Sequence, residues 1–208
     1  MKLELLYPDF PFWRAEVSRL ALFIGDIPFD NVHPSRKEFA EMKESGALTF
    51  GQVPVLKVDG KMIAQTGAIA RFCGKLSGLY PVDDHFLAAK VDEIIDAATD
   101  ITNLMSPTMR EKDPEKKMAL RQSLAEEKLP KWLSYLERYL EKNGSTGFFV
   151  SNQLTIADLA IWRLMGWLSG GILDGIPKDI LEPFTLLKSH FDTIGNLPKV
   201  HQWMSKQY

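Results

Sequence analysis

The sequence predicts an α/β N-terminal domain followed by an all-α C-terminal domain. Up to about residue 80, short apolar runs of strand length alternate with stretches of helical periodicity. After Tyr80 the apolar residues recur with helical spacing throughout, and no convincing strand separates the helical stretches. The 208 residues are enough for two small domains, each with a core of its own.

The first domain is expected to alternate strands and helices, and Asp59-Gly60 is a strong turn signal between two hairpin strands. The expected elements are a strand at Leu3–Leu6, a helix at Arg14–Ile24, a short strand at Phe29–Val32, a short helix at Phe39–Glu44, hairpin strands at Val53–Val58 and Lys61–Ala64, and a helix at Gln65–Leu76. This order describes a small mixed sheet with helices packed on it, which is a thioredoxin-like plan.

The second domain is expected to be entirely helical. The amphipathic stretches that support this are Ala88–Met105, Pro114–Lys142, Thr155–Leu168 and Pro177–Ile194. We therefore expect a thioredoxin-like domain at 1–78, a linker at 79–84 and an all-helical domain at 85–208.

One helix start is marked by a local motif. Thr155-Ile156-Ala157-Asp158 has the form of a capping box, in which the Asp158 carboxylate accepts from the Thr155 amide. Because this motif recurs in folded proteins generally, we interpret it as the start of a well-capped buried helix rather than as a site.

Composition excludes several classes of function. The 25 basic and 27 acidic residues are scattered and give a formal net charge of -2, so no basic stripe is available for nucleic acid. No apolar run approaches the roughly 18–20 residues that span a bilayer, and the acidic residues Glu4 and Asp9 argue against a signal peptide. We expect a cytoplasmic protein without a membrane or nucleic-acid partner.

Metal chemistry is not expected either. The only cysteine is Cys73, so neither an internal disulfide nor a pair of cysteine ligands can form within one chain. The four histidines show no metal-ligand spacing. Cys73 lies in an expected helix, and we interpret it as a packing residue.

Two motifs of the first domain carry a specific resemblance. The stretch Phe50-Gly51-Gln52-Val53-Pro54 leads into an expected strand and the Asp-Gly turn, and Gln65-Thr66 then opens a helix. This combination and its spacing resemble the glutathione-binding core of the cytosolic glutathione transferases, and the capping box falls where that family has one. The resemblance covers nearly the whole chain and is closest to the sigma and alpha classes of the tyrosine type.

The resemblance implies how glutathione is bound. The proline after Val53 is cis in the family, so that the Val53 backbone pairs with the cysteinyl part of glutathione like an added strand. Gln52, Val53 and Pro54 are therefore expected to bind glutathione. Gln65 and Thr66 open a helix, whose free amides and positive dipole end suit the γ-glutamyl carboxylate. The alternative that Thr66 is only an N-cap stays open.

Tyr7 follows the first expected strand, where the family has a tyrosine that donates its hydroxyl to the glutathione sulfur. Such a bond stabilises the thiolate selectively and makes the thiol more acidic. Arg14 matches a family position close to the sulfur, where it assists thiolate formation. Tyr7 and Arg14 are thus the expected catalytic residues. The alternatives are an aromatic strand residue for Tyr7 and a surface residue for Arg14.

The loop between Tyr7 and Arg14 departs from the family, which has a short Arg-Gly loop there, whereas this chain has Pro8-Asp9-Phe10-Pro11-Phe12-Trp13. The resemblance implies that this loop and the first long helix form the walls of a pocket for apolar electrophiles. Ordinary packing between the domains is the alternative. The expected lining residues are Phe10, Phe12, Trp13, Met105 and Met109.

Four further residues are assigned by resemblance alone. Phe39 and Lys43 fall near family positions that bind the glycine carboxylate of glutathione. Asp100 matches an aspartate that reaches the γ-glutamyl ammonium across a homodimer. Phe50 occupies a position where some classes insert an aromatic side chain into the partner subunit.

The leading hypothesis is an enzyme of detoxification, a glutathione transferase that conjugates the glutathione thiolate to apolar electrophiles. One alternative is a glutathione-dependent isomerase, similar to prostaglandin isomerases, which returns glutathione unchanged. Another is a non-catalytic protein of the same fold that serves in binding or structure. The expected ligands are glutathione as co-substrate, a small-molecule electrophile, and no metal.

Overall fold

The computed structural model describes residues 1–207 and confirms the order of elements in the first part of the chain. A four-stranded mixed sheet has the strand order β2-β1-β3-β4, in which β1 pairs parallel with β2 and antiparallel with β3. The elements are β1 Leu3–Leu6, α1 Trp13–Ile24, β2 Asp30–Val32, α2 Arg36–Glu44, β3 Val55–Val58, β4 Lys61–Ala64 and α3 Thr66–Ser77.

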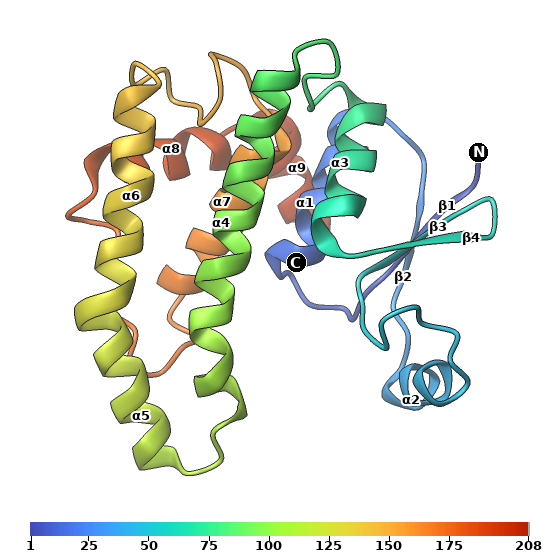
Figure 1. Ribbon diagram of the computed structural model, residues 1–208, viewed down its shortest axis with the longest axis horizontal. Helices are drawn as coiled ribbons and strands as arrows, with labels where there is room; N and C mark the ends of the chain where they lie inside the picture. The colour runs from blue at the N-terminus through green and yellow to red at the C-terminus, as the bar shows by residue number, and fades with distance from the viewer. Residues whose placement is uncertain (208) are drawn as a thin grey trace.

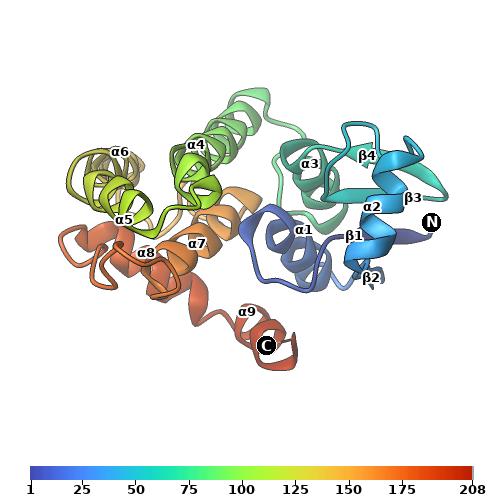
Figure 2. The same ribbon diagram turned by 90° about the horizontal axis from the view of Figure 1, so that it is seen from below.

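Alternation along the central strands gives the sheet two covered faces. Leu3 and Leu5 of β1 belong to the main core, which α1 and α3 complete, whereas Leu6 packs in a second, smaller cluster. Phe39 and Met42 of α2 close that smaller cluster from the opposite face. Figures 1 and 2 accordingly show α1 and α3 between the sheet and the helical part of the chain. Strand β1 thus contributes apolar side chains to both faces of the sheet.

Local sequence signals explain where these elements begin and turn. Asp59 and Gly60 both have positive φ, 48° and 83°, as the two-residue hairpin turn between β3 and β4 requires. Helix α2 begins at Arg36, three residues earlier than expected, because Ser35 and Glu38 form a capping box. Strand β3 begins at Val55 rather than Val53, since Pro54 cannot donate to the ladder.

The second part of the chain is helical, as expected. Helices α4 and α6 are long and lie side by side, with α7 behind them (Figure 1). Residues 78–84 connect α3 to α4. The helices are α4 His85–Arg110, α5 Pro114–Ser123, the π-helical turn η1 Leu124–Lys128, α6 Leu129–Lys142, α7 Ile156–Ser169, α8 Thr185–Gly195 and α9 Pro198–Gln207.

The stretch 114–142 is not one regular helix, and Pro130 gives the reason. Proline has no N–H to donate to the carbonyl four residues earlier, here Glu126, and its ring crowds that carbonyl. The backbone accommodates Pro130 by forming the wider turn η1, which contains Glu126 and lies directly before α6. The expected helix is therefore divided into two.

The prediction of a helix at 177–194 is wrong for residues 177–184. Residues 177–184 form successive short turns, with amide-to-carbonyl bonds from Ile180 to Pro177 and from Phe184 to Leu181. Pro183 disfavours a helical conformation at the residue before it, so α8 begins only at Thr185. The sequence interpretation also missed α9, which has Pro198 as its first residue, a favoured position for proline.

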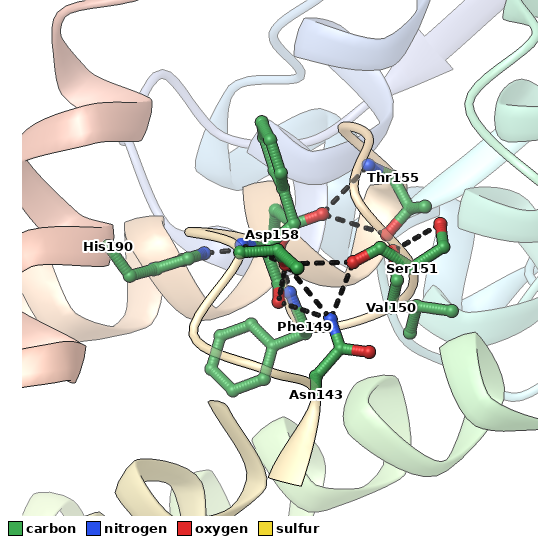
Figure 3. A network of polar contacts seen from close by, with 9 residues as sticks. Asn143, Phe149, Val150, Ser151, Thr155, Asp158 and His190 are labelled. Carbon is green, nitrogen blue, oxygen red and sulfur yellow. Dashed lines mark hydrogen bonds and ion pairs between the residues drawn. The ribbon is translucent and has the colours of Figure 1, made fainter. Parts of the chain in front are cut away.

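Helix α7 is the centre of the molecule and packs against α1, α4 and α8. Its expected capping motif is present: the fully buried Asp158 carboxylate accepts from the Thr155 amide at 2.8 Å and from the Thr155 hydroxyl at 2.9 Å (Figure 3). It also accepts from the Phe149 amide at 2.8 Å and lies 3.2 Å from His190 Nε2 of α8. One carboxylate therefore joins α7, α8 and the preceding loop.

None of the helices formed by residues 1–207 is long and apolar enough to cross a membrane.

Candidate active site

The ends of three strands, β1, β3 and β4, lie together at one edge of the sheet. Leu6 of β1 pairs with Val55 of β3, and Val55 pairs with Ala64 of β4. The chain therefore leaves β1 at Tyr7, enters β3 from Pro54 and leaves β4 at Gln65, all at the same edge. The sheet topology brings together residues that are far apart in the sequence.

A narrow polar crevice of about 30 Å³ opens at this edge. The Val53–Pro54 peptide bond that borders it is cis, as the resemblance implied. The lining includes six residues expected to bind glutathione or assist catalysis: Arg14, Gln52, Val53, Pro54, Gln65 and Thr66. Phe50 and Ala64 complete the lining.

The crevice ends at the N-terminus of α3. Gln65 is the N-cap residue and Thr66 is the first helical residue, so Thr66 is not an N-cap. Gln65 makes no side-chain capping bond, and its φ is +75°, a conformation that costs a non-glycine residue on the order of 1–3 kcal/mol. The first amides of a helix attract an anion. The strained turn thus presents the Gln65 side chain and these amides to the crevice.

A wider cleft of about 300 Å³ adjoins the crevice between the sheet domain and the helices. Arg14 and Val53 border both spaces. The cleft is walled mainly by aromatic side chains and one methionine, and three of its lining side chains carry a hydroxyl group. Its remaining lining residues are Tyr7, Phe10, Phe12, Thr102, Ser106, Met109 and Trp167. A molecule with a polar part and an apolar part fits such a pair of spaces.

Tyr7 lies in the cleft directly after β1, and its amide is bonded to the Val32 carbonyl at 3.1 Å. Burial raises the pKa of the Tyr7 phenol above its ordinary value near 10, while the positive charges of Arg14 and Arg19 oppose this increase. The phenol is therefore neutral at neutral pH. A neutral phenol can donate a hydrogen bond to a bound anion.

Trp13 and Met105 do not line this cleft, contrary to expectation. Both side chains are fully buried in the main core. The Trp13 indole N–H donates to Thr102 Oγ1 at 2.8 Å, and Met105 lies on the buried stripe of α4 with Ile101 and Ala98. Phe10, Phe12 and Met109 do border the cleft.

Three other expected ligands lie outside both spaces. Phe39 packs in the smaller core cluster on the far face of the sheet. Lys43 is exposed on the last turn of α2, and its side chain lies beside Gly51. Asp100 is exposed on α4. Their assignment to glutathione stays a prediction from resemblance.

The sequence interpretation missed three cleft residues, Thr102, Ser106 and Trp167. The first two could have been found from Met109, because residues 102, 106 and 109 lie one turn apart on one side of a helix. Trp167 had no such signal, since α7 is apolar on nearly all sides.

Metal-ligand clusters and the single thiol can both be checked in the described part of the chain. Within 1–207, no cluster of histidine, cysteine and acidic side chains could hold a metal ion. Burial raises the pKa of the Cys73 thiol to about 12, so this thiol is not a nucleophile at neutral pH.

Comparison with known proteins identifies both parts of the chain. Residues 4–74 match the family model of the glutathione S-transferase N-terminal domain, and residues 99–207 match that of the glutathione S-transferase C-terminal domain. The glutathione S-transferase of Plasmodium yoelii yoelii is 30% identical over 202 residues, with 93% of this chain and 89% of the relative covered. Glutathione S-transferase 1 of Ascaris suum is 29% identical, with 92% and 90% covered.

Solved structures agree along the whole chain. Prostaglandin synthase D of Nilaparvata lugens superposes with a TM-score of 0.87 at 28% identity, and 100% of this chain and 99% of that chain are covered. The monomeric glutathione S-transferase Na-GST-3 of Necator americanus superposes with a TM-score of 0.82 at 27% identity, with 100% and 98% covered. This chain belongs to the glutathione S-transferase family.

Proposed function

We propose that the protein is a glutathione transferase of the tyrosine type, close to the sigma and alpha classes. Glutathione occupies the polar crevice, and its sulfur points into the cleft beside Tyr7. One observation supports this most directly: Tyr7 borders a cleft that shares Arg14 and Val53 with the crevice. A thiol held at that junction lies between its binding groups and an apolar co-substrate.

In this proposal the glutathione is held along its length by the edge of the sheet. The Val53 backbone pairs with the cysteinyl unit in the manner of an added strand. The γ-glutamyl carboxylate meets Gln65, Thr66 and the first amides of α3. Val53, Gln65 and Thr66 all line the same crevice, so one extended tripeptide lying along it can contact all three.

Tyr7 then activates the thiol by donating its hydroxyl hydrogen to the sulfur. A charge-assisted bond worth about 1.5–3 kcal/mol lowers a thiol pKa of about 8.5 by roughly 1–2 units. The thiolate fraction at pH 7 rises from about 3% to about a quarter or more. Arg14 adds positive charge at the same junction. The thiolate attacks an apolar electrophile that rests against Phe10, Phe12, Met109 and Trp167.

A glutathione-dependent isomerase is the second candidate. It is favoured by one comparison, the superposition on prostaglandin synthase D of Nilaparvata lugens. The same thiolate would then be released unchanged after the rearrangement. Product analysis with labelled glutathione separates the two activities, because only conjugation retains the label in the product.

We also propose a cytoplasmic homodimer that serves in detoxification. Phe50 is 60% exposed, and a groove of about 290 Å³ between α4 and α6 has Phe86, Tyr139 and Phe149 in its wall. An exposed aromatic side chain and an aromatic groove on one chain suit a two-fold interface, in which each copy fills the other's groove. Sedimentation of the wild type and of Phe50→Ser tests this, with a dimer expected only for the wild type.

The transferase proposal is tested by measuring glutathione affinity and conjugation of an activated aryl halide. We expect wild type to bind glutathione and to turn over, and Tyr7→Phe to bind glutathione with an affinity within about twofold of wild type but to lose roughly 10-fold to 100-fold in kcat/KM. Normal binding without turnover in the wild type would contradict the transferase activity. Equal turnover in both proteins would remove Tyr7 from the catalytic role.

A further inference from the structure

The segment between β1 and α1 forms one wall of the cleft and is held in an unusual way. Its backbone makes two successive three-residue turns, in which the Phe10 amide bonds the Pro8 carbonyl at 2.7 Å and the Phe12 amide bonds the Phe10 carbonyl at 2.9 Å. The Phe10 and Phe12 rings stack with centroids 6.0 Å apart. Because Phe10 is 40% exposed, packing alone does not fix this wall.

Arg19 of α1 donates hydrogen bonds to the backbone of this wall, residues 8–12. Its guanidinium is fully buried and donates to the carbonyls of Pro8 and Phe10, both at 3.4 Å. It also donates to Asn31 Oδ1 of β2 at 2.9 Å. The planar fork of an arginine can serve several acceptors at fixed angles, which a lysine ammonium cannot reproduce. One side chain thus joins α1, β2 and both turns of the wall.

The same guanidinium lies against Tyr7. Its central carbon is 5.7 Å from the centroid of the Tyr7 ring, within the range of a cation–π contact. Tyr7 and the wall that follows it are therefore held by one group. A displacement of Arg19 would move the phenol and the Phe10 ring together.

The position of Arg19 is itself fixed by a buried partner. Glu16 Oε1 accepts from Arg19 at 2.8 Å, and Glu16 Oε2 accepts from the Trp203 indole of α9 at 3.1 Å. Arg163 of α7 donates to the Pro11 carbonyl of the same wall. The wall is thus anchored to both parts of the chain by Arg19 and Arg163.

We propose that Arg19 is a positioning residue of this active site, which aligns the Tyr7 hydroxyl and the aromatic wall of the cleft without touching either substrate. This inference rests on the proposed function for its kinetic consequences. Its structural part, that Arg19 orders residues 8–12, stands on the contacts alone. The two parts are tested by separate measurements on the same variants.

The first variant is Arg19→Lys, which keeps the charge beside Glu16 but loses the fork. We expect kcat/KM for the aryl halide to fall about tenfold or more, because small misplacements of reacting groups are costly. The pH profile of kcat/KM should shift to higher pH, while glutathione affinity stays within about twofold. Amide hydrogen exchange in the peptide that covers residues 8–12 should become about tenfold faster.

Asn31→Ala is the second variant and decides the matter if Arg19→Lys does not fold. It removes one acceptor of Arg19 and leaves the buried charge pair intact, so the same changes are expected at about threefold. The control is Arg138→Lys on the exposed face of α6. Arg138 also lies over a tyrosine ring, at 5.1 Å from the Tyr135 centroid, and donates to a carbonyl, Ser134.

The outcomes separate the two proposals. Faster exchange with reduced kcat/KM in either variant, and neither change in Arg138→Lys, supports the positioning role. Exchange and kcat/KM within twofold of wild type in the folded variants would overturn it. A wild type that binds glutathione but never turns over contradicts the proposed function, and the exchange rates still decide whether Arg19 orders the wall.

Discussion

The Trp13 indole N–H donates to Thr102 Oγ1 at 2.8 Å across the junction between the sheet domain and the helices. Both residues are buried, and the Thr102 hydroxyl donates in turn to the Ala98 carbonyl at 2.8 Å. Thr102 also borders the cleft. A single hydrogen bond thus connects the start of α1 to the wall that α4 contributes to the candidate active site.

Replacing Thr102 by valine removes the acceptor and leaves the indole N–H buried without a partner. We expect the free energy of unfolding, measured by urea denaturation, to fall by about 1–3 kcal/mol. Thr102→Ser is the control, since it keeps the hydroxyl and should lose less. A Thr102→Val protein as stable as wild type would mean that this bond contributes nothing to holding the two parts together.

Asp158→Asn tests the buried carboxylate that joins α7, α8 and the loop before α7. The asparagine NH2 group replaces one of the two carboxylate oxygens, so it sets donors against either the Phe149 amide or the Thr155 amide, which are donors themselves. We expect a loss of about 3 kcal/mol in the free energy of unfolding. Asp192→Asn is the matched control, because Asp192 forms an exposed ion pair with Lys188 on α8 and should cost less than about 1 kcal/mol. Similar losses in both variants would refute the central role of Asp158.

Gln65 is expected to increase the affinity for glutathione while its positive φ lowers the stability of the fold. Gln65→Gly relieves the positive φ, so thermal unfolding should show an equal or higher Tm, while calorimetry should show glutathione affinity reduced by about tenfold or more. Gln65→Ala lacks the same side-chain amide but keeps the strain, and should bind as weakly with a lower Tm than Gln65→Gly. Unchanged glutathione affinity in both variants would remove Gln65 from the binding site.

The Cys73 thiol should be unreactive toward alkylating reagents in the folded protein. With a thiol pKa of about 12, only about one molecule in ten thousand carries the thiolate at pH 8, and the side chain is buried. We expect an alkylating reagent to leave native protein unlabelled for hours and to label the urea-unfolded protein completely. Rapid labelling of the native protein would show that the helix around Cys73 opens readily.

Most of the fold could be predicted from the sequence because local signals and burial agree there. Strands β1 and β4 have the expected bounds, and Asp59-Gly60 fixed the hairpin between β3 and β4. The errors occur where a proline changes the backbone within an apolar pattern. Pro130 divides an expected helix, and Pro183 delays the start of α8.

The residues of the candidate site that lie at strand ends could be predicted from the sequence. The residues that line the cleft could be predicted only in part. Tyr7, Val53 and Gln65 follow from strand ends that the sheet topology brings together. Trp13 and Met105 illustrate the limit, because a large apolar residue near a cleft serves equally well in the core behind it. Which of the two occurs depends on helix rotation and on partners distant in sequence, such as Thr102 for Trp13.

In the proposed mechanism, Tyr7 acidifies the thiol of bound glutathione. Ultraviolet titration of the thiolate of glutathione in the binary complex measures this directly, without an electrophile. We predict an apparent thiol pKa roughly 1–2 units lower in the wild-type complex than in the Tyr7→Phe complex, at equal saturation with glutathione. The same thiol pKa in both complexes would show that Tyr7 does not activate the thiol.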